Sequence, residues 1–498
     1  MCRDNNFQLV NPDAGIKGNV DMVRELFTSN DATGLAKLVR QREVSALDLV
    51  DEAIRRIEAL NPRLNAVVHR LYDYAREVAT RPLPDGPLAG VPILLKDLSV
   101  EWKGFPVTNG SRYFKNYVAS TDWEISARMR NAGLIPVGKT NVPENGWCAA
   151  TEPVLFGSTV NPWNAGVVAG GSSGGSAVAV ASGMVPLADA SDGGGSIRIP
   201  AANNGIVGLK PSRGRVTFGP GVVDYWYGAV AFLCVSRSVR DTASYLDVVA
   251  GAHPGDPYAL PKPQASYLSA VGQRPKRLRI GVAHSEPDGE PLNFDVKAAV
   301  EKASDLCRQL GHEVIEHDFR YDVEVFKSTF GRITAVLSSS FFQGCAERFG
   351  RVTPDDVEPA TWGIIELGKT VSGVQHATDI EIMRKMSRDL VESLRPYDVF
   401  LAPVQPVPPR PAGWYDMSEP DIQVYNERLM RDIVFTAPFN ITGQPAITLP
   451  LHRNANDIPV GIQFVAPVGD EATLLNLSAQ IEEAQPWKDI RPPAFYAV

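Results

Sequence analysis

The sequence is short of several features that mark particular classes of protein. Its five cysteines are widely spaced and never form C-x-x-C, which argues against a disulfide framework or a zinc knuckle. No apolar run approaches the about 20 residues that span a bilayer, and residues 1–10 lack the apolar core of a signal peptide. Acidic residues outnumber basic ones by 57 to 49, so the net charge of −8 gives no general attraction to nucleic acid or anionic lipid. We therefore expect a cytoplasmic protein without a nucleic-acid or membrane partner.

The length and composition predict a large globular protein. Hydrophobic residues make up 44% of the chain and charged residues 21%, far from the values typical of disorder. At about 150 residues a domain, 498 residues leave room for three domains, but the chain has no internal repeat and no convincing linker. Residues 1–30 show no clear period. We predict an N-terminal arm over residues 1–30 and one large domain over residues 31–498.

Strand and helix patterns alternate along most of the chain. Ser45 with Asp48 forms a capping-box signal at the start of a helix. The short apolar run 91–95 is typical of a buried strand and ends in Lys96 and Asp97. Further elements are expected at 121–137, 278–315, 379–401, 445–465 and 471–484. This alternation predicts an α/β fold with right-handed parallel crossovers.

The segment 168–211 is the most informative, because it is unusually rich in glycine and serine. Such tracts are most often flexible linkers, but the apolar stretch 177–187 in its middle is long enough for a helix and a strand. A phosphate-binding loop is a second interpretation, for which no complete motif is present. Residues 170–174 also satisfy G-x-S-x-G, the nucleophile elbow of α/β-hydrolases, a motif short enough to occur by chance.

A nucleophile elbow needs a histidine late in the chain. The candidates lie in segments without other catalytic features: His253, His284, His312, His317, His376 and His452. A lysine can act as the base instead where burial disfavours its ammonium form. Lys96 is the right residue type at the end of a buried strand, and a surface ion pair with Asp97 is its alternative interpretation.

Several motifs resemble, in the right order, those of the amidase signature family. They are GPLAGVPILLKD (86–97), GKTNVPE (138–144), STVNPWN (158–164), GGSSGGSA (170–177), SDGGGSIRIPA (191–201) and GLKPSRGRV (208–216). The signature core covers about residues 86–220, and the resemblance extends to PFNITGQPAITLP and IPVGIQFVAP near the C-terminus. The family implies an α/β/α fold, in which a mixed, mostly parallel twisted sheet is covered by helices on both faces.

The resemblance implies a Ser-cisSer-Lys triad of Ser196, Ser172 and Lys96. Ser196 would attack the acyl carbon, while Ser172 would carry its proton to Lys96 and return one to the leaving amine. Ser196 follows Ser172 by 24 residues, as the family pattern requires, which favours Ser172 over its neighbour Ser173.

Other residues around the nucleophile receive roles by the same resemblance. The oxyanion hole would consist of the backbone N–H groups of Gly193, Gly194 and Gly195. Asp192 and Arg198 would brace the loop. Many family members read Gly-Thr-Asp-Thr-Gly-Gly-Ser here, so Gly193 removes a side chain from the implied acyl pocket and puts the specificity in doubt.

The substrate pocket is less well defined by the sequence. Trp147 follows GKTNVPE, where the family often lines its acyl pocket, so it is either a pocket wall or a core residue. Ser173 is kept as a candidate substrate contact. Tyr225, Trp226 and Tyr227 are either a lid over the pocket or ordinary core packing.

The resemblance implies an amidohydrolase that uses water and neither a metal nor an organic cofactor. Its substrate would be a small carboxamide, an anilide or a linear or cyclic oligoamide, with esters and carbamates as further candidates. The C-terminal block looks most like enzymes of the 6-aminohexanoate-cyclic-dimer hydrolase type. One alternative is the A subunit of a tRNA-dependent amidotransferase, but the sequence motif that such subunits usually carry in mid-chain is missing. The other is an inactive binding homologue, although all three triad positions are intact. A homodimer is compatible with the sequence but is not required by it.

Overall fold

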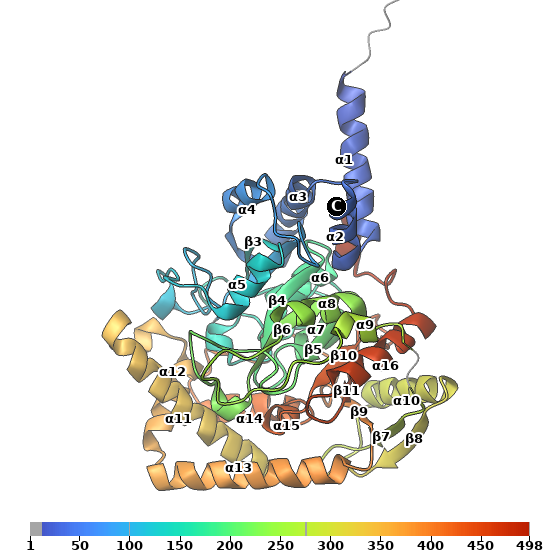
Figure 1. Ribbon diagram of the computed structural model, residues 1–498. Coiled ribbons are helices and arrows are strands. Elements are labelled where there is room, and N and C mark those ends of the chain that lie inside the picture. The colour runs from blue at the N-terminus through green and yellow to red at the C-terminus, as the bar shows by residue number, and fades with distance from the viewer. Residues whose placement is uncertain (1–11, 99, 274–275, 498) are drawn as a thin grey trace, which may run out of the picture.

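An eleven-stranded mixed sheet runs through the molecule and carries the polar segments singled out in the sequence (Figure 1). The computed structural model describes residues 12–98, 100–273 and 276–497. The strand order is β1-β3-β2-β4-β6-β5-β10-β11-β9-β7-β8. The strands are β1 (Val67–Arg70), β2 (Pro92–Lys96), β3 (Ile135–Thr140), β4 (Leu187–Asp192), β5 (Val207–Lys210), β6 (Ala231–Ser236), β7 (Arg279–Ala283), β8 (Glu313–His317), β9 (Val399–Pro403), β10 (Ala446–Leu449) and β11 (Ile462–Val465).

The expectation of a mostly parallel sheet is wrong, although the sheet is mixed as expected. Six of the ten neighbouring pairs are antiparallel. The parallel pairs form two groups, β3-β2-β4 and β7 with β8 and β9, where helical crossovers join strands. Between these groups, β6 separates β4 from β5 and pairs antiparallel with both, and β10 returns directly into β11. Antiparallel strands need no helical crossover, which is why strand–helix–strand patterns did not predict this part.

Helices pack against both faces of the sheet, which gives the expected α/β fold. In the view of Figure 1, α8 lies in front of the sheet and α6 behind it. The helices are α1 (Pro12–Ser29), α2 (Ala32–Gln41), α3 (Ala46–Leu64), α4 (Tyr72–Ala79), α5 (Glu124–Asn131), α6 (Gly174–Ala181), α7 (Arg198–Asn204), α8 (Val239–Val249), α9 (Tyr267–Ala270), α10 (Phe294–Gln309), α11 (Val323–Phe349), α12 (Pro359–Thr370), α13 (Gly373–Leu394), α14 (Ile422–Asp432), α15 (Ala437–Ile441) and α16 (Glu471–Ala484). Five short 3₁₀ turns complete the elements: η1 (Arg112–Phe114), η2 (Glu144–Gly146), η3 (Trp226–Gly228), η4 (Pro354–Asp356) and η5 (Pro493–Ala497).

Local signals in the sequence match the elements that they predicted. The Ser45 side chain accepts from the Asp48 N–H and the Asp48 carboxylate accepts from the Ser45 N–H, so the predicted capping box is present at the start of α3. The expected helix over 471–484 coincides with α16.

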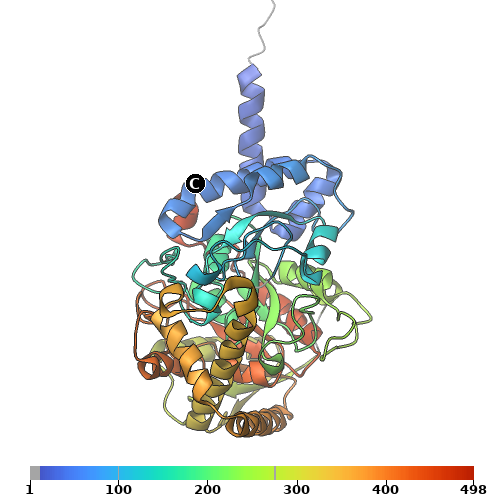
Figure 2. The same ribbon diagram turned by 90° about the vertical axis from the view of Figure 1, so that its left-hand side faces the viewer.

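The described part of the expected N-terminal arm is largely helical. It forms α1, which projects from the rest of the chain in both views (Figures 1 and 2). The end of α1 is anchored, because Val23 and Phe27 are buried in the main core. Residues 1–11 of the expected arm lie outside the described residues.

A group of helices from the second half of the chain stands beside the sheet and bounds the site described below. In Figure 2, α11 and α12 face the viewer. Both pack against each other, and α11 also packs against α13. None of the helices in the described part of the chain is long and apolar enough to cross a membrane.

Candidate active site

Lys96 ends β2, a strand that is buried along its whole length. Its Nζ lies 2.8 Å from Ser172 Oγ and 2.9 Å from Ser191 Oγ. Burial lowers the pKa of Lys96 from 10.5 to about 7, although the charges of Asp189 and Asp192 act in the opposite direction. Lys96 therefore loses its proton far more easily than an exposed lysine does. The alternative of a surface ion pair with Asp97 is wrong, because Lys96 is fully buried.

Ser172 lies in the loop that leads into α6, and it is almost fully buried. The Gly171–Ser172 peptide bond is cis, as the resemblance implied. The glycines before it allow a close approach of other backbone segments. A Cβ atom at Gly171 would lie 2.5 Å from the Cys148 carbonyl oxygen, and Gly170 has a φ of +79°. The predicted loop therefore needs glycine for packing, and it places Ser172 against Lys96.

Ser196 lies between β4 and α7 and is partly exposed to a pocket that Ser172 also lines. The two serine loops are tied together, because the Ser173 N–H donates to the Ser196 carbonyl oxygen at 3.2 Å. The prediction of Ser173 as a substrate contact is wrong. Its side chain is fully buried and its Oγ donates to the Ser191 carbonyl oxygen, so it lies behind the pocket wall.

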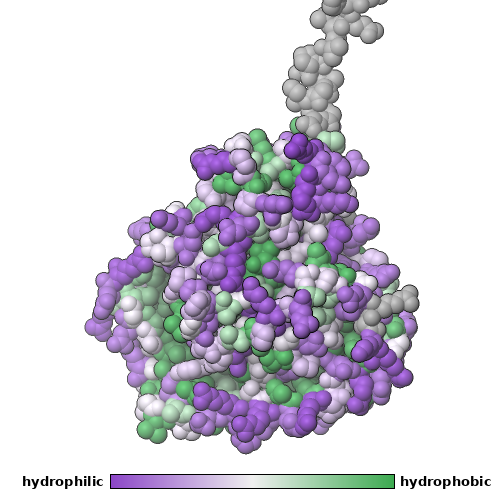
Figure 3. All heavy atoms as spheres, viewed as in Figure 1, coloured by the Kyte–Doolittle hydropathy of each residue, from purple (hydrophilic) through white to green (hydrophobic). Residues whose placement is uncertain are grey.

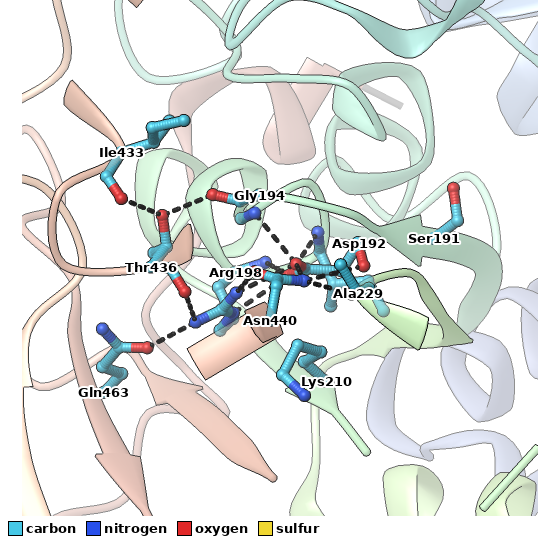
Figure 4. Close-up of polar contacts among 12 residues, drawn as sticks. Ser191, Asp192, Gly194, Arg198, Lys210, Ala229, Ile433, Thr436, Asn440 and Gln463 are labelled. Carbon is cyan, nitrogen blue, oxygen red and sulfur yellow. Dashed lines mark hydrogen bonds and ion pairs between the residues drawn. The ribbon is translucent and has the colours of Figure 1, made fainter. Parts of the chain in front are cut away.

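Asp192 and Arg198 form a buried ion pair that holds the turn around Ser196, as expected (Figure 4). Two side-chain contacts join them, from Arg198 Nη2 to Asp192 Oδ1 at 2.9 Å and from Nε to Oδ2 at 3.0 Å. Burial alone would raise the pKa of Asp192, but the charge and hydrogen bonds of Arg198 outweigh it and hold that pKa well below its usual range. Asn440 contacts both partners, through Nδ2 to Asp192 and through Oδ1 from Arg198 Nη2.

The three glycines before Ser196 do not all face the pocket. Gly193 and Gly194 line it. The Gly195 N–H instead donates to Asp192 Oδ1 at 2.9 Å, so this N–H is already engaged and Gly195 is removed from the expected oxyanion hole. The absence of a side chain at Gly193 also has a local cause. A Cβ atom there would lie 2.9 Å from the ring of Trp226, which occupies that space.

The pocket has a volume of about 820 Å³ and is lined mainly by aromatic and aliphatic side chains. Trp147 lines it, which matches the expected wall, and packs against Phe342 of α11 with ring centroids 6.1 Å apart. Of the expected lid, Tyr225 and Trp226 line the pocket. The remaining aromatic lining residues are Phe114, Tyr117, Trp123, Phe232, Phe330, Phe341 and Phe349.

Two residues of the site were missed from the sequence. Ser191 gives Lys96 its second hydroxyl contact and lines the pocket. Its place in the quoted SDGGGSIRIPA motif was the available signal. Asn440 contacts Asp192 across 248 positions of sequence, a distance at which local patterns carry no information. Among the described residues, no group of three or more His, Cys, Asp or Glu side chains is placed to hold a metal ion.

Comparisons with known proteins agree with this site. The family model described as Amidase matches residues 48–475. The 6-aminohexanoate-cyclic-dimer hydrolase of Paenarthrobacter ureafaciens is 37% identical over 475 residues, which cover 93% of this chain and 96% of that protein. A solved structure of 6-aminohexanoate cyclic dimer hydrolase has a TM-score of 0.88 at 36% identity and covers 94% of this chain and 99% of its own. The structure of a bacterial aryl acylamidase of the amidase signature family has a TM-score of 0.83 at 28% identity, covering 94% and 98%.

The family model spans most of the chain, and a relative well above 30% identity covers nearly all of it. These matches extend over the buried lysine, the cis peptide bond before Ser172 and the braced serine turn. The chain therefore belongs to the amidase signature family and is an amidase, a hydrolase of amide C–N bonds.

Proposed function

We propose that this amidase works through an acyl-enzyme on Ser196, with Ser172 as the proton relay and Lys96 as the base. The observation that carries the proposal is the 2.8 Å contact between Lys96 Nζ and Ser172 Oγ. It places a buried amine, which loses its proton readily, directly behind a serine on the wall of the pocket that Ser196 also faces.

Each step moves one proton through the same two groups. Ser196 Oγ attacks the acyl carbon and its proton passes through Ser172 to the neutral Lys96 amine. The negative charge on the former carbonyl oxygen is stabilised by the N–H groups of Gly193 and Gly194, where each such donor is typically worth about 2.7–4 kcal/mol. The C–N bond then breaks and the proton returns through Ser172 to the leaving amine. Water attacks the acyl-enzyme by the same route and releases the acid.

The lining of the pocket favours amides with apolar or aromatic groups. Trp147, Trp226 and Phe330 surround the region near the serines, and the volume of about 820 Å³ is within the range of pockets for drug-sized ligands. We propose an anilide or a linear or cyclic oligoamide as the substrate, with esters and carbamates as slower or alternative substrates. Support comes from the relatives, which are named for a cyclic amide dimer and for aryl acylamides. Free glutamine, the substrate of the amidotransferase alternative, is small and has no apolar group to fill a pocket lined mainly by aromatic and aliphatic side chains.

Intact mass spectrometry after treatment with a fluorophosphonate tests the nucleophile. We expect one adduct on the wild type and none on Ser196→Ala. Ser120→Ala is a matched control that should keep the adduct, since Ser120 also lines the pocket and makes no hydrogen bond to a lysine among the described residues. A wild type that stays unlabelled while a reference serine hydrolase reacts would favour the inactive binding homologue.

A panel of amides then tests the substrate class. It contains anilides, cyclic and linear oligoamides, esters, carbamates and glutamine, and each is assayed with the wild type and with Ser196→Ala. We expect the anilides or oligoamides to give the highest kcat/KM. A preference for glutamine would instead support the amidotransferase alternative.

A further inference from the structure

The pocket combines an apolar interior with very few charged groups. Among the described residues that line it, only Glu101, Asp224 and Arg348 belong to the charged residue types Asp, Glu, Lys and Arg. Most of the surface in the view of Figure 3 is hydrophilic, and apolar side chains show between the hydrophilic ones. Within the described lining, the guanidinium of Arg348 is the one basic group that a ligand filling this pocket can meet.

The two acidic groups are already engaged by neighbouring donors. Asp224 Oδ1 accepts from the Gly228 N–H at 2.8 Å within its own turn, and burial raises the pKa of Asp224. Glu101 accepts from Tyr117 Oη at 2.7 Å through Oε1 and from the Thr121 hydroxyl at 3.5 Å through Oε2. Their capacity to accept further hydrogen bonds from a ligand is therefore reduced.

Arg348 lies in the last turn of α11 and is held in place without an ion pair among the described residues. Its guanidinium lies over the ring of Tyr117, 4.3 Å from the centroid, and its Nη1 donates to Tyr117 Oη at 3.1 Å. A guanidinium has five N–H donors in a planar fork that suits a carboxylate. These two contacts hold the guanidinium beside Tyr117, and among the described residues the hydrogen bond uses only Nη1, so the other donors are left for a ligand or solvent.

We propose that Arg348 binds a carboxylate at the far end of the substrate, so that the preferred substrates are amides with an apolar chain between the scissile bond and a free carboxyl group. This inference rests on the proposed function, because it names the substrate class of the same pocket. The apolar walls hold the chain, and the guanidinium pairs with the carboxylate at the rim.

The position of Arg348 along α11 sets how far this carboxylate lies from the reaction. Gly146 borders the relay serine, since a Cβ atom there would lie 3.2 Å from Ser172 Oγ. The next residue, Trp147, contacts Phe342, and Arg348 follows Phe342 by six residues on the same helix. At 1.5 Å a residue this adds about 9 Å along α11 beyond the wall next to the serines. We therefore expect the carboxylate to stand at the end of an ω-carboxyalkyl chain, as in a linear oligoamide, rather than directly beside the scissile amide.

The kinetic test uses 4-nitroanilides of alkanoic acids in pairs of equal chain length, with and without a terminal carboxylate. A second series carries the carboxylate on the amine side of the amide. We expect Arg348→Ala to lower the ratio of kcat/KM for the acid to that for its neutral partner by about 10- to 100-fold, mainly through KM. Arg348→Lys should lie between, because it keeps the charge but not the fork. The ratio should depend on chain length and weaken as salt is added.

Arg384→Ala is the control, since Arg384 is an exposed arginine of α13 whose side chain is 68% accessible. It should leave the ratio unchanged. If Arg348→Ala lowers kcat/KM equally for the acids and their neutral partners, Arg348 has a packing role and the proposal is overturned. The proposal is also overturned if Arg348→Ala changes kcat/KM for neither kind of substrate in either series. A preference for ammonium-ended anilides that is lost in Glu101→Gln would overturn it in favour of the carboxylate of Glu101.

Direct binding separates this inference from the proposed function. Calorimetry with the Ser196→Ala protein measures the affinity for an ω-carboxy anilide without turnover. Adding Arg348→Ala should weaken this binding by about the same 10- to 100-fold as in the kinetic test. Adding Arg384→Ala should leave the affinity unchanged. Binding that depends on Arg348 supports the inference even if Ser196 proves not to be the nucleophile, whereas equal affinity with and without Arg348 overturns it even if the acyl-enzyme is found.

Discussion

Lys96 and Lys139 are two fully buried lysines on neighbouring strands, and they have opposite surroundings. Lys139 Nζ lies 3.1 Å from the Asp97 carboxylate and 2.7 Å from the Pro106 carbonyl oxygen. Lys96 Nζ contacts the hydroxyls of Ser172 and Ser191. One lysine thus has a carboxylate to balance its charge, and the other has neutral groups.

The difference explains why Lys96, and not Lys139, suits the role of base that we propose. A carboxylate in contact stabilises the ammonium form, and Asp97 in turn has its pKa held down by Lys139 and its other partners despite burial. Hydroxyls can accept from an ammonium or donate to an amine, so they do not oppose the loss of the proton. Lys139 is therefore a structural residue beside the site, while Lys96 is suited to take a proton from Ser172.

The largest expected effect comes from Lys96→Met, which keeps the apolar stem and removes the amine. We expect kcat/KM for a good anilide to fall by at least about 10²–10⁴-fold, because the base is lost. The circular dichroism spectrum should remain that of the wild type. Full activity in this variant would remove Lys96 from the mechanism.

Lys139→Met is the matching change on the other side of the comparison. It leaves Asp97 buried without its cationic partner, which typically costs about 3–5 kcal/mol of stability. Urea denaturation should show this loss, and the double variant Lys139→Met/Asp97→Asn should recover part of it. A Lys139→Met protein of normal stability but without activity would reverse the roles assigned to the two lysines.

The sequence predicted that Lys96 is buried and where the two serines lie. It did not predict which of the two lysines pairs with Asp97. The apolar run before Lys96 indicated burial, and the glycine tract together with the family resemblance placed Ser172 and Ser196. No local pattern showed that Asp97 would turn to Lys139 rather than to its neighbour Lys96, because that choice depends on the register between β2 and β3. The engaged N–H of Gly195 was missed for a different reason, because it depends on how Asp192 folds back over its own turn, three residues away.

The pH dependence of stability distinguishes the two lysines further. The pKa of Lys96 is about 7 in the folded protein and near 10.5 in the unfolded chain, so between these values only the unfolded chain holds the proton. The contribution of Lys96 to stability therefore rises with pH across this window. We expect Lys96→Met to be more stable than the wild type near pH 6, with the gap closing towards pH 10. Denaturation midpoints at a series of pH values measure this, and a constant gap would mean that the pKa of Lys96 is not lowered by folding.

The smallest expected effect concerns Asp189, a buried carboxyl on β4 whose charge favours the ammonium form of Lys96. Burial raises the pKa of Asp189 to about 7, and the Tyr245 hydroxyl contacts its Oδ1 at 3.3 Å. The wild-type kcat/KM should rise with pH through a midpoint near the Lys96 pKa of about 7, because the free amine is the active form. Asp189→Asn removes a charge that raises this pKa, so the midpoint should move to lower pH, by about half a unit.

Asp247→Asn is the control for this shift, because Asp247 lies on α8 with Tyr245 but accepts from the backbone of Tyr267 and Leu268. Its midpoint should equal that of the wild type. A shift of Asp189→Asn to higher pH would contradict a lysine base, since removing a negative charge can only make a neighbouring amine lose its proton more easily. A lower plateau without any shift would instead assign Asp189 to packing alone and leave burial as the cause of the low pKa of Lys96.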